Sequence, residues 1–219
     1  MMTVDYRLNA LVDASLTDIA PLADLAAIAA RNGATIIQYR DKQATTREMI
    51  EQAKRILDAL KPTGVPLVIN DRVDVALASG ADGVHLGADD VDADTARRLL
   101  GPDAIIGLTV KSLADAERAA RAPTDYACIG GVFETISKVN PDAPVGLDGL
   151  RQLRSYLREA RPEMPVGAIA GITLERVRPV IAAGADGVAV ISALFRTSDI
   201  ATTTKSFRDE IDAALESRR

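Results

Sequence analysis

The sequence predicts an α/β fold, a single (βα)₈ TIM barrel, and three observations support this prediction. Eight short apolar runs alternate with eight segments of helical period, which is the pattern of βαβ units that build a parallel sheet. The segment ASGADGV at residues 78–84 is repeated as AAGADGV at residues 182–188, so one helix end, turn and strand start occur twice. The length of 219 residues is normal for one barrel of this kind. A doubly wound open sheet is the alternative.

The expected elements follow one another along the chain. Strands are expected at residues 7–12, 35–39, 67–69, 83–86, 105–108, 126–129, 166–169 and 187–191. Helices are expected at residues 21–32, 46–60, 72–79, 92–100, 113–121, 147–160, 174–183 and 200–217. We find no linker or low-complexity stretch, and we expect one domain that spans residues 1–219.

Capping residues mark several of the expected helix ends. Gly33 follows the first helix, where a glycine in the left-handed conformation commonly ends a helix. Thr45 with Glu48 three residues later is typical of a capped helix start. Gly80 and Gly184 fit helix ends in the two copies of the repeat.

Composition and charge exclude several classes of function. The hydrophobic share is 47% and the aromatic share 3%, so Ala, Val, Ile and Leu must build the core, as suits a parallel sheet buried on both faces. A net charge of −5 without a basic patch argues against a nucleic-acid surface. One Cys and one His cannot form an intrachain disulfide or a zinc site. Without a signal peptide or an apolar run of about 18 residues, we expect a soluble cytoplasmic protein with no membrane contact.

Four residues with chemically active side chains are expected to be structural. Asp82 and Asp186 lie in the repeated segment at the amino ends of strands, where they more often serve the turn than catalysis. His85 lies within a strand and is expected to be a satisfied wall histidine. Cys128 lies inside the sixth strand and is expected to be a small buried hydrophobe.

Carboxylates follow two neighbouring strands of the expected sheet. Asn70 and Asp71 follow the third strand, and Asp89 and Asp90 follow the fourth. Two oxygen ligands from separate loops at the carboxyl ends of strands suit Mg²⁺, which takes one or two carboxylates and leaves room for substrate phosphates. The alternative is helix capping, for which Asp92 also competes. We expect Asp71 and one of the later pair to be the metal ligands.

An amide and two cations follow the second strand, in the segment QYRDK at residues 38–42. Strand alternation can turn Gln38, Arg40 and Lys42 to one side and the residues between them to the other. Such a cluster can hold a diphosphate, Arg by forked hydrogen bonds and Lys as a point charge. If this segment stood alone, a solvated run of charged residues would be the alternative. Because Asp71 and Asp90 are expected nearby, a diphosphate-binding site is favoured.

Three later loops offer hydroxyls and glycines. Thr109 follows the fifth strand, and a long polar loop at residues 130–141, which begins with two glycines, follows the sixth. Loops of this length are often phosphate-binding or mobile active-site loops. Gly171 after the seventh strand lets backbone N–H groups approach a phosphate, and Ser192 follows the eighth. These features favour phosphate chemistry.

Taken together, the motifs resemble the thiamine phosphate synthase family. They are QYRDK (38–42), PLVINDRVDVALASGADGVHLGADD (66–90), IIGLT (105–109), GGVFETISK (130–138), AGIT (170–173) and ADGVAVIS (185–192). The resemblance implies a (βα)₈ barrel with a magnesium-dependent reaction. In it, a hydroxymethylpyrimidine diphosphate couples with a (carboxy)thiazole phosphate to give thiamine phosphate and diphosphate. Diphosphate departure would leave a pyrimidine methylene cation, which the thiazole nitrogen attacks.

The resemblance also implies residue roles, carried over position by position. The Mg²⁺ ligands would be Asp71 and Asp90. The pyrimidine diphosphate would be bound by Gln38, Arg40, Lys42, Asn70, Thr109 and Lys138. The thiazole phosphate would be bound by Thr135, Ser137, Gly171, Ile191 and Ser192. The catalytic groups, which stabilise charge on the leaving diphosphate or position it, would be Arg40, Lys42, Thr109 and Lys138.

The chain departs from the usual family pattern at five positions. Thr109 replaces a usual Ser and Ser137 a frequent Thr, and both changes keep the hydroxyl. Lys111 stands where His is common, and Gly131 replaces a frequent Pro. Ala170 replaces the first of two glycines, and its methyl group can crowd the backbone that approaches the thiazole phosphate.

Three alternatives compete with the synthase interpretation. A thiazole tautomerase of the same fold uses a His where Gly131 stands, and it lacks the full set of cations and carboxylates. Other phosphate-binding barrels, such as epimerases, need an acid–base pair that the sequence does not offer. A non-catalytic barrel that binds thiamine intermediates would have no use for the Mg²⁺ pair. The expected partners are two small-molecule substrates; a homo-oligomer is compatible with the sequence.

Overall fold

The computed structural model describes residues 4–135 and 143–218, and its strands form a closed parallel barrel in the order β1-β2-β3-β4-β5-β6-β7-β8. The strands are β1 (Leu8–Asp13), β2 (Ile36–Arg40), β3 (Leu67–Asn70), β4 (Gly83–Leu86), β5 (Ile105–Val110), β6 (Tyr126–Ile129), β7 (Val166–Ile169) and β8 (Gly187–Val190). Because β1 pairs with β8, the sheet has no open edge, and the doubly wound alternative is excluded. The predicted TIM barrel is confirmed.

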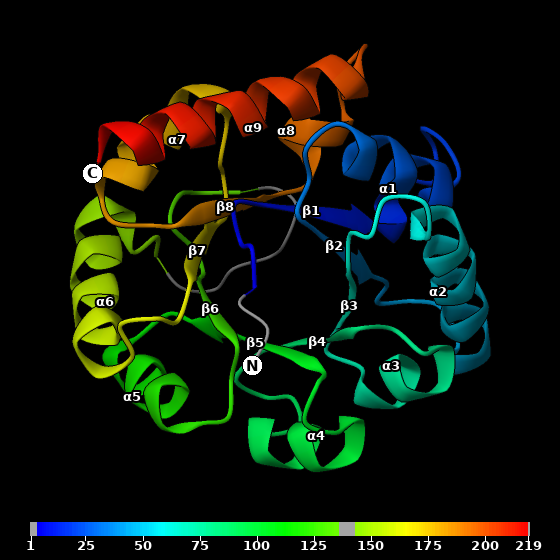
Figure 1. Cartoon of the computed structure of the whole chain (residues 1–219), viewed down its shortest axis with the longest axis horizontal. Helices are drawn as coiled ribbons and strands as arrows, with labels where there is room; N and C mark the ends of the chain where they lie inside the picture. The colour runs from blue at the N-terminus through cyan, green and yellow to red at the C-terminus, as the bar shows by residue number, and fades with distance from the viewer. Residues whose placement is uncertain (1–3, 136–142, 219) are drawn as a thin grey trace.

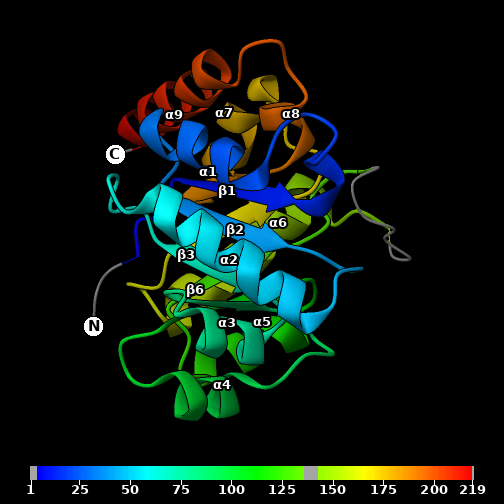
Figure 2. The ribbon, with the colours of Figure 1, turned by 90° about the vertical axis from the view of Figure 1, so that its right-hand side faces the viewer.

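Helices surround the strands on all sides (Figure 1). They are α1 (Leu22–Arg31), α2 (Thr46–Leu60), α3 (Val73–Ser79), α4 (Ala93–Leu100), α5 (Leu113–Arg121), α6 (Gly146–Ala160), α7 (Leu174–Ala182), α8 (Ser192–Phe195) and α9 (Ile200–Ser217). Seen from the side, the strands lie between α1 and α9 on one side and α3 and α4 on the other (Figure 2). Among the described residues, no helix has the length and apolar character needed to cross a membrane.

The predicted elements all form, with end points that differ by two residues at most. Thr45 and Glu48 form the expected capping box at the start of α2, and Gly80 ends α3 in the left-handed conformation. Two short helical segments were not predicted: α8 and the 3₁₀ turn η1 (Ala14–Leu16). Neither is long enough to display a helical period in the sequence.

The side chains of each strand alternate between the barrel interior and the surrounding helices. An inner cluster, defined as Tyr6, Leu11, Ile36, Val68, Ile105, Tyr126, Cys128 and Ala189, fills the interior. The outer core contains Val12 and Tyr39, which pack toward the helices. Gln38 and Arg40 therefore share the inner side of β2 with Ile36, as the alternation predicted.

Glycines make room for the two aromatic rings of the inner cluster. A Cβ atom at Gly167 would collide with the Tyr6 ring, and one at Gly107 would collide with the Tyr126 ring. The two rings lie 4.7 Å apart between centroids at a tilt of 44°. Tyr6 and Tyr126 thus fill part of the barrel interior, and the missing side chains of Gly167 and Gly107 leave the space for their rings.

Asp82 and Asp186 are structural, as expected. Asp82 Oδ2 accepts a hydrogen bond of 2.7 Å from the backbone N–H of Leu67, and Asp186 Oδ2 accepts one of 3.0 Å from Val166. Asp125 does the same for Ile106 at 2.8 Å. Each carboxylate thus satisfies a backbone donor near the amino end of the preceding strand, far from the end where a site is expected.

Cys128 is buried in the inner cluster, and we expect it to resist alkylation in the native protein. Burial raises the pKa of its thiol to about 12, against a side-chain hydrogen bond with Tyr6 that lowers it. Because the thiolate is the nucleophile, iodoacetamide should modify the folded protein far more slowly than the urea-unfolded protein. Mass spectrometry of timed samples measures both rates. Equal rates would contradict the buried position.

Candidate active site

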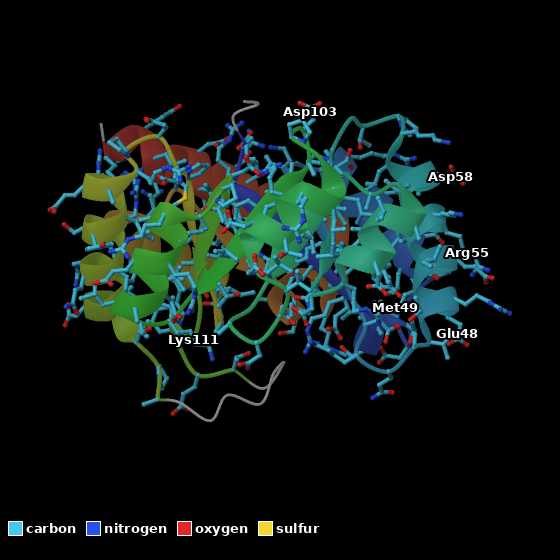
Figure 3. All side chains as sticks on the ribbon, turned by 90° about the horizontal axis from the view of Figure 1, so that it is seen from below. Glu48, Met49, Arg55, Asp58, Asp103 and Lys111 are labelled. Carbon is cyan, nitrogen blue, oxygen red and sulfur yellow. The ribbon has the colours of Figure 1, made fainter. Side chains whose placement is uncertain are left out.

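The loops that follow the strands gather at one end of the barrel. Figure 3 shows Lys111, which follows β5, and Glu48, at the start of α2, at the same edge of the molecule. Asp103, which precedes β5, and Asp58, near the end of α2, lie at the opposite edge. The predicted site residues follow strands or end them, so they belong to the edge that Lys111 marks. In TIM barrels, this carboxyl end is where active sites lie.

Arg40 and Asp13 form a buried ion pair at this end of the barrel. The β1–β2 register places the two residues opposite each other, and Arg40 Nη1 donates a 2.5 Å hydrogen bond to Asp13 Oδ2. Asp13 Oδ1 accepts a second bond of 2.9 Å from the Ser15 backbone N–H. Burial works to raise the pKa of Asp13, but the hydrogen bonds from Ser15 and Arg40 hold it below its usual range. Arg40 is therefore fixed in the wall and is not part of a solvated charge run.

Asp13 is a residue of the site that no motif in the sequence indicates. The first strand was expected to end at residue 12, so Asp13 fell just outside the element that positions it. One signal was available: strand alternation continued by one residue puts Asp13 on the same side as Leu11 and Asn9, inside the barrel.

Lys42 forms an ion pair with Asp71, which joins the loops after β2 and β3. Asp71 has φ of 65°, a conformation that costs energy for residues other than glycine. Its backbone N–H donates a 2.8 Å hydrogen bond to the His85 carbonyl on β4. Helix capping does not explain this conformation, because the N-cap of α3 is Arg72 and it makes no side-chain cap bond. The strained backbone instead places the carboxylate beside Lys42 and Asp90.

Asp90 is the carboxylate that approaches Asp71. The Asp90 carboxylate lies close enough to Asp71 to affect its pKa, and Asp90 Oδ2 accepts a 2.6 Å hydrogen bond from the Gly87 N–H. Asp89 is exposed, and Asp92 caps α4 through a 2.8 Å bond from the Thr95 N–H. Among the three aspartates, Asp90 therefore lies in the site.

The two carboxylates titrate differently because of their surroundings. Burial works to raise the pKa of Asp71, but hydrogen bonds with Lys42 and Asp90 hold it below its usual range. Burial and the Asp71 carboxylate together raise the pKa of Asp90, against the Gly87 N–H, which works to lower it. The two carboxylates lie close enough that ionisation of Asp71 opposes ionisation of Asp90.

Thr109 on β5 is held by His85 on β4. His85 Nε2 lies 2.8 Å from Thr109 Oγ1, and His85 Nδ1 lies 3.0 Å from the Tyr126 hydroxyl. The His85 and Tyr126 rings are nearly parallel, at 16°, with centroids 5.6 Å apart. His85 is 7% exposed, which confirms the prediction of a satisfied wall histidine.

The loops after β6 and β7 are bound to each other. Val132 N–H donates to the Ile169 carbonyl and Phe133 N–H to that of Ala170, at 3.1 and 3.2 Å. Gly171 has φ of 64°, and a Cβ atom there would collide with the Glu134 carbonyl oxygen. Thr135 and Gly171 thus lie on adjoining loops. Ser137 and Lys138 lie outside the described residues.

Ala170 has φ of 91°, a conformation that residues with a side chain rarely adopt. An alanine in this conformation is strained by about 1–2 kcal/mol. We therefore expect Ala170→Gly to leave the free energy of unfolding unchanged or to raise it by up to about 1 kcal/mol, because strain relief offsets the greater entropy of the unfolded chain. Urea denaturation measures the change. Ala88→Gly, at an exposed loop residue without positive φ, is the control and should lower stability; an equal loss in both variants would contradict strain at Ala170.

A cavity of about 710 Å³ opens between the loops after β1, β2 and β8. Four predicted residues line it: Arg40, Lys42, Ile191 and Ser192. The lining also includes residues that the sequence analysis missed: Asp13, Ala14, Ser15, Leu16, Thr17, Asp41, Gln43, Ala44 and Arg196. Gln38 is 2% exposed and lies deeper on β2 than Arg40. Asn70 ends β3 next to Asp71.

Arg196 closes one side of the cavity. It donates a 2.9 Å hydrogen bond to the Ser15 carbonyl and pairs with Asp18 at 3.1 Å, which joins the end of α8 to the loop after β1. The sequence offered no signal for Arg196, because it follows a four-residue helix that periodicity does not detect.

Comparisons with known proteins agree on one family. A family model described as thiamine monophosphate synthase matches residues 8–194. The thiamine-phosphate synthase of Agrobacterium fabrum is 72% identical over 219 residues, 100% of both chains. That of Chloroflexus aurantiacus is 41% identical over 213 residues, covering 97% of this chain and 96% of the other.

A solved structure gives the same result. The thiamine phosphate pyrophosphorylase from Pyrococcus furiosus superimposes with a TM-score of 0.83 at 35% identity, over 97% of this chain and 98% of that one. The family match, the relatives that cover the whole chain and the barrel with its carboxyl-end cavity lead to one conclusion. The chain is an enzyme that belongs to the thiamine monophosphate synthase family.

Proposed function

We propose that this enzyme joins a hydroxymethylpyrimidine diphosphate to a (carboxy)thiazole phosphate. The bond between the pyrimidine methylene carbon and the diphosphate oxygen breaks, and a bond from that carbon to the thiazole nitrogen forms. With a carboxylated thiazole, CO₂ leaves and a proton takes its place. The observation that carries the proposal is the linked set of Lys42, Asp71 and Asp90 beside the Arg40 cavity, in a chain of this family.

Arg40 and Lys42 would bind the diphosphate. Arg40 is held in place by Asp13, with 17% of its side chain exposed, and Lys42 is 52% exposed beside Asp71. Arg40 can offer a forked pair of donors and Lys42 a compact charge, and both line the same cavity. Negative charge grows on the diphosphate as it leaves, so fixed cations stabilise the transition state more than the bound substrate. Lys138, outside the described residues, is proposed as a third cation.

Asp71 and Asp90 fit a magnesium ion. Carboxylate oxygens are the ligands that Mg²⁺ prefers, and the ion commonly uses one or two of them together with substrate phosphate oxygens and water. In the described part of the chain, no group of three or more His, Cys, Asp or Glu side chains is arranged to hold a metal, so these two carboxylates would act with the diphosphate. When bound, Mg²⁺ would supply neutralising charge at the leaving group.

We expect magnesium binding to weaken as the pH falls. The pKa of Asp90 is raised by burial and by Asp71, so a proton remains on Asp90 at pH values where an ordinary aspartate is ionised. A cation must displace that proton, and its affinity therefore rises with pH through the Asp90 pKa. Isothermal titration with Mg²⁺ at several pH values measures this dependence. In the Asp90→Asn control the pH dependence of the Mg²⁺ affinity should shrink; a wild-type affinity that does not change with pH would contradict a raised pKa at Asp90.

The remaining chemistry requires no general base. Departure of the diphosphate would leave a pyrimidine methylene cation, which the thiazole nitrogen attacks through its own lone pair. Both ring nitrogens of His85 lie within hydrogen-bond distance of hydroxyl groups in the barrel wall, so His85 is not positioned as an acid–base group for a substrate. Orientation of the two substrates would supply much of the acceleration.

The thiazole phosphate would lie at the loops after β6, β7 and β8. Gly171 and Thr135 offer a backbone and a hydroxyl donor, and Ser192 lines the cavity next to Ile191. Ser137 completes the proposed set and lies outside the described residues. A phosphate bound near the loops after β7 and β8 is common in TIM barrels. Gln38, Asn70 and Thr109 would contact the pyrimidine diphosphate from the inner wall.

A product assay tests the proposal. Purified protein is incubated with both phosphorylated substrates and Mg²⁺, and the products are identified by mass spectrometry. We expect thiamine phosphate. Isomerised thiazole without coupling would instead identify a tautomerase, although Gly131 stands where that relative has its His. Tight binding of both substrates without any product would identify a non-catalytic barrel.

A further inference from the structure

Three side chains on neighbouring strands form a hydrogen-bonded chain that leads from the barrel interior to the carboxyl end of β5. The Tyr126 hydroxyl on β6 lies 3.0 Å from His85 Nδ1 on β4, and His85 Nε2 lies 2.8 Å from Thr109 Oγ1 on β5. Tyr126 is fully buried, and Thr109 lies partly exposed at the carboxyl end of its strand. Gly107 lies two residues before Thr109 on β5, and because it has no Cβ atom, the Tyr126 ring fits against it.

The burial of Tyr126 fixes the direction of the first hydrogen bond. Burial raises the pKa of Tyr126 well above its usual value, so the phenol keeps its proton. Within the described residues, His85 Nδ1 is the one acceptor in hydrogen-bond contact with this hydroxyl. A buried O–H without an acceptor would lose the hydrogen bond that water gives it in the unfolded chain, which destabilises the fold. Tyr126 therefore donates, and Nδ1 of His85 accepts.

The direction of the second hydrogen bond follows from the first. A neutral imidazole has one N–H, so when Nδ1 accepts, Nε2 carries the hydrogen and donates it to Thr109 Oγ1. An imidazolium would place hydrogens on both nitrogens and leave the Tyr126 proton without an acceptor. Thr109 thus accepts from His85, and its own hydroxyl hydrogen is available for another group.

The Thr109 side chain is also held by packing. A Cβ atom at Gly130 would lie 3.0 Å from the Thr109 methyl carbon, so this methyl group occupies the space that the glycine leaves open. A β-branched side chain has few allowed rotamers, and the methyl contact together with the His85 bond selects one of them. The orientation of the hydroxyl is therefore set before a ligand binds.

We propose that Tyr126 and His85 are positioning residues that hold the Thr109 hydroxyl as a hydrogen-bond donor, aimed at an acceptor atom of the bound pyrimidine diphosphate. The ligand part of this proposal rests on the proposed function. The proposal fixes the direction of the hydrogen bond to the ligand. Thr109 donates to an unprotonated nitrogen or an anionic oxygen of the ligand, and it does not accept a hydrogen bond from it. A donor oriented in advance needs no rearrangement when charge develops on the substrate.

The first test needs no substrate. The chain has one histidine, so the two imidazole nitrogen signals in a ¹⁵N spectrum of the untagged protein belong to His85. We expect Nε2 to give the signal of a protonated nitrogen and Nδ1 that of an unprotonated one. Tyr126→Phe, which keeps the ring and removes the donor, should change the Nδ1 signal. A proton on Nδ1 in the wild-type protein would overturn the proposal.

The second test separates positioning from a purely structural role. Thr109→Val keeps the shape and removes the hydroxyl, and we expect kcat/KM for the pyrimidine diphosphate to fall about tenfold or more, with the KM for the thiazole phosphate unchanged. Thr109→Ser should restore most of the activity. Tyr126→Phe alone should lower kcat/KM about threefold to tenfold, but it should add no loss in the Thr109→Val background.

The outcomes distinguish a failure of the hydrogen-bonded chain from a failure of the proposed function. Losses that multiply in the double variant would show that Tyr126 acts independently of Thr109 and would overturn its role as a positioning residue. Thermal unfolding of each variant shows whether the fold is intact, and the wild-type nitrogen spectrum decides the proton position whatever the variants do. If the wild-type enzyme forms no thiamine phosphate, the proposed function fails, while the spectrum still reports on the hydrogen-bonded chain.

Discussion

Replacing Asp71 with Asn is expected to lower kcat/KM for thiamine phosphate formation by about 10²–10³-fold. The substitution removes one of the two carboxylates that would hold Mg²⁺ and separates Lys42 from its ion-pair partner. Asn is chosen because it tolerates positive φ, so the loop can keep the conformation that Asp71 has at φ of 65°. The loss should therefore arise from charge and coordination and not from unfolding.

The control for this variant is Asp89→Asn, which removes the same charge from an exposed residue next to Asp90. Its activity should equal that of the wild-type enzyme. Both variants are assayed over a range of Mg²⁺ concentrations, and urea denaturation checks that both are folded. Wild-type activity of Asp71→Asn at saturating Mg²⁺ would remove Asp71 from the metal site.

Arg40→Ala is expected to reduce both diphosphate binding and stability. The guanidinium pairs with Asp13, and only 8% of the Asp13 side chain and 17% of the Arg40 side chain are exposed. Removal of one partner from a buried pair leaves an uncompensated charge and costs about 3 kcal/mol. The pKa of Asp13 lies below its usual range in the wild-type protein, so the pair stabilises the fold above the unfolded pKa and loses that effect as the pH falls through the folded value.

A double variant separates the two effects. Asp13→Asn together with Arg40→Ala removes the stranded carboxylate, so we expect the free energy of unfolding to recover most of the loss while the KM for the pyrimidine diphosphate stays raised. Arg151→Ala, on the exposed face of α6, removes a cation of the same kind and should change neither quantity. Urea denaturation and steady-state kinetics provide the measurements. Recovery of substrate binding in the double variant would show that Arg40 does not bind the diphosphate.

The strands and helices of this protein could be predicted because hydrophobic periodicity reports directly on burial. Alternation along QYRDK also predicted correctly that Gln38 and Arg40 share the inner side of β2 while Tyr39 faces the helices. The short α8 and η1 could not be predicted, because segments of three or four residues have no period.

The site could be predicted only in part, because some of its contacts depend on register and backbone conformation. Asp13 meets Arg40 through the pairing of β1 with β2, which no local pattern encodes. Asn70 and Asp71 resembled helix caps, and only the structure shows the positive φ of Asp71 and its side chain beside Lys42. Tyr126, one of the partners of His85, lies 41 residues away along the chain, so the wall histidine was predictable but its contact with Tyr126 was not.

The ratio of diphosphate released to thiamine phosphate formed, measured with Mg²⁺ and again after EDTA, tests whether Asp71 and Asp90 hold a magnesium ion. If Asp71 and Asp90 hold a magnesium ion at the leaving group, the two products should form in equal amounts with Mg²⁺. Both should fall to background with EDTA and return when Mg²⁺ is restored. Thiamine phosphate formation that continues at the same rate in EDTA would contradict a magnesium ion at the leaving group, and diphosphate release without coupling to the thiazole would contradict the proposed reaction.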